Sequence, residues 1–281
     1  MNNGFLSPAE IASFCSDVSV KKIDLTKGRA CILAILAGAF IGFAAYGSNM
    51  AAHNLLAEPG TFGLGRCLAG AIFGTGLMLV VVAGGELFTG NTLIIVGVIE
   101  RKVHISKMLI NWMLIWTGNL LGSLLIAWMV ASTPLFSSSN NILAAVTIKA
   151  AAGKVALSFP SAFILGILCN WLVCLAVWMS YAAQDVVGKL LSCFFPIWLF
   201  ICSGFEHSVA NMCYIPMGIL AKKNILWAQA ALDLGVSQSQ MDALNWINMF
   251  YTNLLPVTLG NIVGGAFFVG TLYSFAYLRK K

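Results

Sequence analysis

Six long apolar runs divide the chain. They cover residues 30–49, 67–98, 106–132, 158–184, 188–220 and 247–278. A helix needs about 20 apolar residues to cross a bilayer, so the second and fifth runs are too long for simple spans. Each of these two is also interrupted by a polar cluster flanked by glycine. The pattern predicts an all-α integral membrane protein with six transmembrane helices, of which the second and fifth are broken.

The first 28 residues stand outside these runs. They are mixed polar and lack the apolar core of a secretory signal peptide. The stretch SPAE at residues 7–10 is typical of a helix start, with serine as N-cap, proline in the first turn and glutamate closing a capping box. We expect residues 1–28 to form an amphipathic helix on the cytoplasmic membrane surface, with a frayed tail as the alternative. Residues 29–281 then form the transmembrane domain.

Composition agrees with this division. Of the 281 residues, 59% are hydrophobic and 9% are charged, whereas soluble domains carry about 25% charged residues. The net charge of +6 comes from short basic clusters between the runs, which indicates membrane orientation and not nucleic-acid binding. Eleven of the sixteen lysines and arginines fall on the side that holds both termini. This bias predicts a multi-pass protein of the cell membrane with cytoplasmic termini and an external loop at 221–246.

Three matches relate the two halves of the chain. GELFTGN (85–91) parallels FEHSVAN (205–211), and ILAILAG (32–38) parallels ILGILCN (164–170). Asparagine and glycine also recur at the same offsets in the third and sixth runs, as Asn111, Gly118, Asn119 and Gly122 and as Asn253, Gly260, Asn261 and Gly264. The matches predict a duplicated three-span unit, about residues 29–132 and 158–278. Because three is odd, the two halves insert with opposite topology.

The two breaks predict a pore. A helix broken in hydrocarbon leaves backbone N–H and C=O groups unpaired, which is tolerated only where protein or a polar cavity covers them. The N-termini of half-helices also present free amides and a positive dipole end, which favour anions. We therefore expect both breaks to line a central path, as in transport proteins built from inverted repeats.

Ionisable residues in the breaks are the candidates for chemistry. His207 stands in mid-span, where such residues are rare and usually functional. An ordinary histidine pKa of about 6.5 permits proton exchange near neutral pH. Glu86 and Glu206 form a matched pair that either relays protons or structures the broken loops by capping backbone amides. We favour the second interpretation, with Asn91 and Asn211 as further loop-structuring residues.

Thr89 and Lys154 have two interpretations each. The Thr89 hydroxyl either donates to an anion or to His207, or it satisfies a nearby carbonyl. From spacing alone Lys154 is an ordinary external charge, and the functional alternative is a buried cation that draws anions inward.

Bulky apolar residues flank both breaks. They are Phe73, Leu77 and Phe88 in the second run and Phe200 and Phe205 in the fifth. Such side chains can form constrictions that strip the hydration from a solute, although any one of them is more often plain packing.

Other classes of protein fit less well. The eight cysteines contain no CxxC pair and lie mostly in apolar runs, so we expect no disulfide, metal site or cofactor. The three histidines sit in separate segments, which argues against a haem-binding redox subunit or other membrane enzyme. A water- or glycerol-type pore is the closest rival, but such pores use two Asn-Pro-Ala breaks, which this chain lacks. A structural or sensory protein leaves the Glu–His cluster unexplained.

Four motifs together carry a resemblance that spans residues 5 to 278. They are AGGELFTGN (83–91), CNWLVCLAVWMSY (169–181), SGFEHSVANM with IPMG (203–218) and PVTLGNIVGG (256–265). In this order they resemble the formate/nitrite transporter family. The resemblance implies a homopentamer of aquaporin-like protomers, each with its own pore for small monovalent weak-acid anions such as formate, nitrite and hydrosulfide.

The resemblance also implies roles for single residues. It places the central histidine of the family on His207, its broken-helix threonine on Thr89, its vestibule lysine on Lys154 and its pore asparagine on Asn170. Its apolar constrictions fall on Phe73, Leu77 and Phe200.

Both lines of reasoning lead to one mechanism. Lys154 and half-helix amides attract the anion, and an apolar constriction makes the bare charge costly. Desolvation then raises the pKa of the substrate, a proton arrives from His207 or from bulk water, and the neutral acid crosses. This mechanism needs no covalent chemistry, so we expect that the protein is not an enzyme. A neutral small-solute pore is the alternative.

Overall fold

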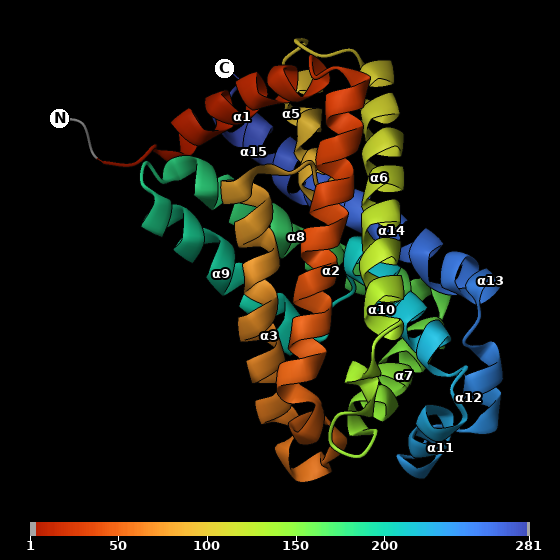
Figure 1. The fold of residues 1–281 in the computed structure, drawn as a ribbon. Helices are drawn as coiled ribbons and strands as arrows, with labels where there is room; N and C mark the ends of the chain where they lie inside the picture. Colours follow the sequence, from red (N-terminus) through yellow and green to blue (C-terminus); the bar gives the residue numbers. More distant parts are fainter. Residues whose placement is uncertain (1–3, 280–281) are drawn as a thin grey trace.

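The computed structural model describes residues 4–279, so residues 1–3 and two lysines counted for orientation, Lys280 and Lys281, lie outside it. The described chain is helical, and an isolated bridge between Phe5 and Ala183 is its only β contact. Six helical segments are long and apolar enough to cross a bilayer. The predicted fold class is therefore confirmed. The first helix and the last one lie at the same end of the molecule (Figure 1).

The first half of the chain forms eleven helical elements up to residue 155. They are α1 (Pro8–Ile23), α2 (Lys27–Ala57), η1 (Pro59–Thr61), α3 (Phe62–Met78), the π-helical η2 (Leu79–Gly84), α4 (Phe88–Asn91), η3 (Thr92–Ile94), α5 (Ile95–Ile99), α6 (Ile105–Ala131), η4 (Pro134–Ser137) and α7 (Ile142–Val155).

The second half continues from residue 159. Its elements are α8 (Phe159–Ala182), α9 (Val186–Ser203), α10 (Ser208–Ala221), α11 (Ile225–Asp233), α12 (Gln238–Ala243), α13 (Trp246–Asn248), the π-helical η5 (Met249–Leu254), α14 (Leu255–Ile262), the π-helical η6 (Val263–Thr271) and α15 (Leu272–Tyr277). Residues 246–277 form one continuous span.

The first span is longer than the apolar run predicts. Helix α2 continues to Ala57, past polar residues that we expected to end it. These polar side chains form hydrogen bonds with the segment around α7. Asn49 Nδ2 donates to Thr147 Oγ1 at 3.2 Å, and His53 Nε2 lies 2.8 Å from Ser139 Oγ. Because their hydrogen-bonding groups are satisfied inside the protein, they do not stop the helix.

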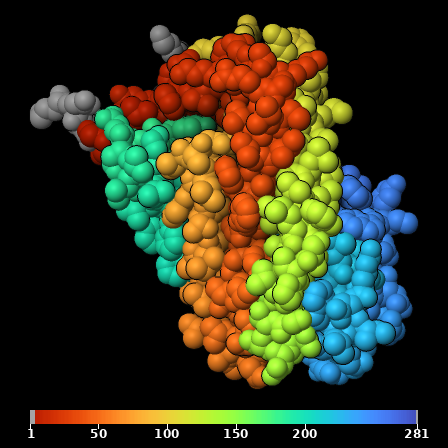
Figure 2. Space-filling view, in the orientation of Figure 1, coloured from red at the N-terminus to blue at the C-terminus, as the bar shows by residue number. Residues whose placement is uncertain are grey.

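A helix, α1, lies within the N-terminal segment before the first span. The capping box forms, with the Ser7 backbone N–H donating to Glu10 Oε2 at 2.7 Å. Ile11, Ala12 and Cys15 are buried, and α1 packs on α5 and α8. Figure 2 shows α1 lying across the end of the bundle, above the surface that α2, α3 and α6 close.

Both predicted breaks are present. The second span ends at Gly84 with a φ of +97°, and α4 starts at Phe88. The fifth span ends at Ser203, followed by Gly204 with a φ of +79°, and α10 starts at Ser208. Glycine adopts this left-handed conformation without a steric penalty, which explains why it ends both half-helices.

The inverted repeat is visible in how the helices pack. A Cβ on Gly122 of α6 would collide with the carbonyl oxygen of Ile35 in α2. In the second half, a Cβ on Gly264 would collide in the same way with the carbonyl oxygen of Ile167 in α8. Both pairs follow the predicted alignment of the halves. In each half, glycine at the matched position thus brings two spans into backbone contact.

The close packing gives a test of stability. Gly122→Ala and Gly264→Ala place a methyl group against a carbonyl that cannot move without shifting a helix, so we expect a loss of roughly 1–3 kcal/mol. The measurement is the apparent Tm of purified protein in detergent. Gly153→Ala in α7 is the control, because a Cβ there meets nothing within 4 Å. It should leave Tm unchanged or slightly raised. An unchanged Tm for the first two variants would contradict the packing argument.

Candidate functional site: a closed path between two cavities

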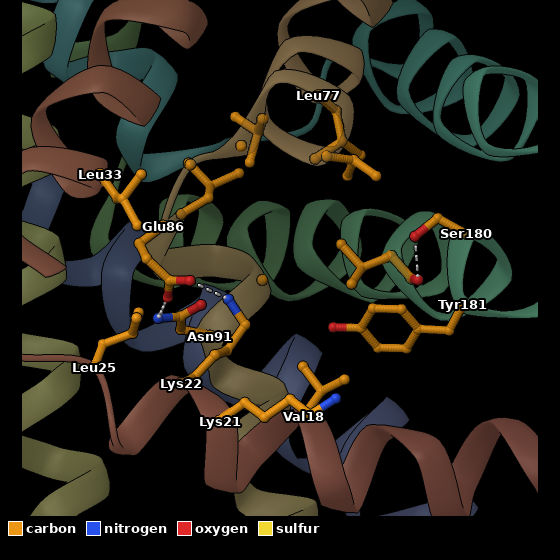
Figure 3. A pocket seen from close by; sticks show the side chains of 17 residues that line it. Val18, Lys21, Lys22, Leu25, Leu33, Leu77, Glu86, Asn91, Ser180 and Tyr181 are labelled. Atoms are coloured by element: carbon orange, nitrogen blue, oxygen red, sulfur yellow. Dashed lines mark hydrogen bonds and ion pairs between the residues drawn. The ribbon is translucent and has the colours of Figure 1, made fainter. Parts of the chain in front are cut away.

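Two cavities enter the protein from opposite ends. The first, the α1-side cavity, has a volume of about 380 Å³ and is lined by residues of α1, η2 and the first break, including Lys22, Leu77 and Glu86. Figure 3 shows Lys22 reaching from α1 to Glu86, with Tyr181 on the opposite wall. The second, the α7-side cavity, has a volume of about 910 Å³ and is lined by residues that include Lys154 and Glu206.

A layer of aromatic rings separates the α7-side cavity from the centre. Tyr214, which lines this cavity, stacks on Phe73 with ring centroids 6.3 Å apart. Phe73 meets Phe200 edge to face at 5.7 Å, and Phe200 stacks on His207 at 5.9 Å. Phe73 and Phe200 are 2% and 1% exposed. These two predicted constriction residues are therefore buried and in contact with each other.

His207 and Thr89 meet at the centre. His207 is the N-cap of α10: the Ala210 backbone N–H donates to its Nδ1 at 3.0 Å. Since Nδ1 accepts, the neutral ring carries its proton on Nε2. That Nε2–H donates to Thr89 Oγ1 at 2.9 Å, across the two breaks. Both side chains are buried. Thr89 and His207 are therefore hydrogen-bonded, but His207 is the donor, opposite to the direction that we expected.

Asn170 holds the threonine segment from α8. Its Nδ2 donates to Thr89 O at 3.2 Å and to Asn261 O at 2.6 Å. Asn170 is fully buried. The contact fixes the backbone of Thr89 and places Asn170 beside the Thr89–His207 pair.

Glu206 organises the second break through side chains. It accepts from Lys154 Nζ at 2.7 Å and from Asn211 Nδ2 at 2.6 Å. In the first break, Glu86 accepts from Lys22 Nζ at 2.8 Å and from Asn91 Nδ2 at 2.7 Å. The expectation that the carboxylates cap half-helix amides is therefore wrong, because lysine and asparagine donors occupy their oxygens.

Asparagines do the capping instead. Asn119 Oδ1 accepts from the Phe88 backbone N–H at 2.8 Å, and its Nδ2 donates to Glu86 O at 2.9 Å. In the other half, Asn261 Oδ1 accepts from the Ser208 N–H at 2.9 Å. Its Nδ2 donates to Glu206 O at 3.0 Å. Each amide thus satisfies one N–H and one C=O that the break would leave unpaired.

Lys22 is a site residue that the sequence analysis missed. It is the counterpart of Lys154, because the same offset relates both ILAILAG to ILGILCN and Lys22 to Lys154. Applying that offset would have found the residue. We stopped the repeats at residues 29 and 158 and so left out α1 and α7, which carry the two lysines.

Phe88 occupies another place than predicted. It packs edge to face on Trp112 of α6, with ring centroids 6.4 Å apart, and not on the Phe73–Phe200 pair. Its neighbour Leu87 lines the α1-side cavity together with Leu77. Successive residues of an extended segment point in opposite directions, which puts Leu87 on the path and Phe88 in the packing. Phe205 lines the α7-side cavity.

The cavities are electropositive. Lys21 and Lys22 line the α1-side cavity against the single carboxylate of Glu86. The α7-side cavity has Lys154 and Glu206 and, in addition, Lys149 and Arg66. The Arg66 guanidinium donates to Ile201 O, at the negative end of the α9 dipole. Net positive charge at both entrances favours an anion over a cation. Among the described residues no three His, Cys, Asp or Glu side chains group as metal ligands would.

Comparison with known proteins agrees with this site. The sequence profile of the formate/nitrite transporter family matches residues 9–275. The chain belongs to the formate/nitrite transporter family. It is 37% identical to a probable formate transporter of Methanothermobacter thermautotrophicus, over the full length of both chains. It is 35% identical to the formate channel FocA of Escherichia coli strain K12, over 98% of this chain and 95% of FocA.

A solved structure is equally similar. The pentameric formate channel with formate bound superimposes with a TM-score of 0.78 at 35% identity, covering 90% of this chain and 98% of that one. The motifs that carried the resemblance therefore identified the family correctly.

The two hydrogen bonds of His207 can be separated by substitution. His207→Asn keeps a side-chain acceptor for the Ala210 N–H but is too short to reach Thr89, whereas His207→Phe loses both. Loss of an N-cap costs about 0.5–2 kcal/mol. We expect His207→Phe to melt below His207→Asn when apparent Tm is compared in detergent. Equal Tm values would mean that the imidazole does not cap α10.

Proposed function

We propose that the protein is a channel for small monovalent anions of weak acids, such as formate, nitrite and hydrosulfide, which cross the cell membrane with a proton as the neutral acid. One observation carries the proposal. Two electropositive cavities approach each other from opposite ends, and a buried layer of apolar rings with a single His–Thr hydrogen bond separates them. The formate channels among its relatives support formate as a substrate.

The first step is attraction. Lys154 lies on one side of the barrier and Lys22 on the other, each 2.7–2.8 Å from a glutamate. The glutamates cancel one charge in each cavity, and Lys21, Lys149 and Arg66 leave a net positive charge. In a low-dielectric cleft this field concentrates anions and excludes cations.

The second step is desolvation. Between the cavities an anion leaves water and meets Phe73, Phe200, Leu77 and Leu87, which are at most 3% exposed. Unpaired charge is strongly disfavoured in such surroundings, so the pKa of the substrate acid rises and it takes up a proton. The neutral acid then crosses the barrier, while a permanently charged ion is rejected.

Geometry supports water in the cavities, rather than His207, as the proton source. The neutral ring has one proton, on Nε2, and giving it up would leave an imidazolate. A doubly protonated ring would point a second N–H at the N–H of Ala210, which now donates to Nδ1. We therefore assign His207 the role of a fixed hydrogen-bond donor, shared between Thr89 and the passing substrate.

Assembly and orientation follow from the same comparisons and from charge. We assign the chain to a homopentamer with one pore in each protomer, supported by the pentameric relative and by large apolar side chains exposed along the spans, such as Met113 and Leu191. The basic bias supports an orientation with α1 and both termini in the cytoplasm. The α1-side cavity is then the cytoplasmic entrance and the α7-side cavity the external one.

Flux into proteoliposomes tests the function. We expect formate, nitrite and hydrosulfide to enter, with formate flux rising as pH falls from 8 to 5 because protons become more abundant. His207→Asn, which keeps the cap, should lower flux roughly tenfold by removing one hydrogen bond worth about 1.4 kcal/mol at the barrier. A pH-independent glycerol flux, with no anion flux, would instead favour a neutral-solute pore.

The role of Lys154 needs a charge-balanced comparison. Lys154→Gln leaves Glu206 buried without its cation, so it should lose both stability and flux. Lys154→Gln combined with Glu206→Gln removes the unpaired charge and should restore Tm towards that of the wild type. We expect formate flux to stay low in this double variant, because the lysine that attracts the anion is still missing. If the double variant instead has wild-type formate flux, Lys154 has only a structural role.

A further inference from the structure

Two cysteines meet at the end of the protein that holds the α7-side cavity. Cys67 lies early in α3, and Cys202 is the last but one residue of α9. The two helices that carry them pack against each other. Cys202 Sγ also lies 3.6 Å from the carbonyl oxygen of Arg66, the residue before Cys67. Both cysteines are free and partly exposed.

The backbones of α3 and α9 are close at this point. A Cβ on Gly70, one turn after Cys67, would lie 2.9 Å from the carbonyl oxygen of Trp198 and 3.2 Å from Cys202 Sγ. Trp198 Nε1 in turn donates to the carbonyl of Cys67 at 2.8 Å. Three contacts thus fix the two thiols on facing turns of two touching helices. Disulfides form between residues with Cα atoms about 4.4–6.8 Å apart, which such an approach permits.

The pair is accessible from one side. Cys202 is part of the lining of the α7-side cavity, which has room for a small organic molecule at about 910 Å³. Under the proposed orientation this cavity opens outside the cell, where disulfides persist, and not into the reducing cytoplasm. The sequence analysis expected no disulfide because it found no CxxC spacing, and spacing cannot show a pair that forms between two spans.

We propose that Cys67 and Cys202 are a redox-sensitive thiol pair, oxidised by a small-molecule disulfide from the α7-side cavity, and that their disulfide holds the Phe73–Phe200 constriction closed. The thiolate of Cys202 attacks one sulfur of the reagent, which forms a mixed disulfide and releases one small thiol. The thiolate of Cys67 then attacks the Cys202 sulfur, which forms the Cys67–Cys202 bond and releases the second small thiol. The reagent gains the two electrons that the cysteines lose, and the leaving thiolates take up the two protons.

The effect on flux follows from where the rings are attached. Phe73 is on α3, after Cys67, and Phe200 is on α9, one turn or less before Cys202. Their ring centroids are 5.7 Å apart, so a substrate passes only when the rings separate. A covalent link between the same two helices restricts that movement. This second part of the proposal rests on the proposed channel function, whereas formation of the disulfide does not.

The experiment uses the full chain in proteoliposomes, treated with bis(2-hydroxyethyl) disulfide. Peptide mass spectrometry should find Cys67 linked to Cys202, and formate flux should fall roughly tenfold because the rings then separate over a higher barrier. Dithiothreitol should reverse both changes. Failure to find the linked peptide in folded protein would overturn the thiol pair.

Three variants sharpen the test. In Cys67→Ser the reagent should remain on Cys202 as a mixed disulfide without a cross-link, and flux should fall less than in the wild type. Cys67→Ser combined with Cys202→Ser should show the same flux before and after the reagent. Cys31→Ser removes another partly exposed thiol, on α2, and should respond as the wild type does.

The outcomes separate the two proposals. A linked peptide with unchanged formate flux would overturn the claim that the disulfide holds the constriction closed. So would a fall in flux of the Cys67→Ser, Cys202→Ser double variant equal to that of the wild type. A wild type that moves no anion before oxidation would refute the channel function, while the linked peptide would still decide whether the thiol pair exists.

Discussion

The structure depends on one constraint, which is that backbone N–H and C=O groups in the interior of a membrane must be paired. Two helices of this protein stop in mid-span, and each stop leaves such groups without a helical partner. Asn119 and Asn261 solve the problem in the same way, since each accepts from the first amide of a half-helix and donates to the carbonyl of the glutamate before it. Without these amides a central polar path could not exist in so apolar a chain.

The glutamates add charge to this framework. A carboxylate buried without a cation would be costly, and each is therefore paired with a lysine from outside its own span. Those lysines come from α1 and α7, short helices that do not cross the membrane but lie against the breaks. The same ion pair thus fixes a loop and puts a positive charge beside the path. Under the proposed function the ion pair couples structure and anion attraction, so substituting one member alone is expected to change both.

The sequence predicted much of this arrangement, and the failures have physical reasons. Hydropathy placed all six spans, because the bilayer imposes a length and an apolar composition on each. The repeat was found because symmetry-related breaks need the same residues. Lys22 was missed although its helix was predicted, because the repeats were taken to start at residues 29 and 158 and so left out α1 and α7. The amide-capping role went to the glutamates instead of Asn119 because a sequence shows which residues are polar, not which way they point. Phe88 and Leu87 were exchanged for the same reason, since one residue of register decides which side chain faces the path.

The function is concentrated where the two halves differ. With the breaks aligned on Glu86 and Glu206, the counterpart of His207 is Leu87, and the counterpart of Thr89 is Val209. The scaffold of Asn, Glu and Lys is repeated, but the imidazole and the hydroxyl each occur once, and they bond to each other across the two halves. A path with a histidine in both breaks would hold two imidazoles in one low-dielectric space, where a shared proton would leave a buried charge. A single histidine with its Nδ1 fixed by the Ala210 N–H avoids this, because it offers one N–H and remains neutral. Under the proposed mechanism the barrier then stays uncharged except for the substrate, and the substrate gives up its own charge to cross.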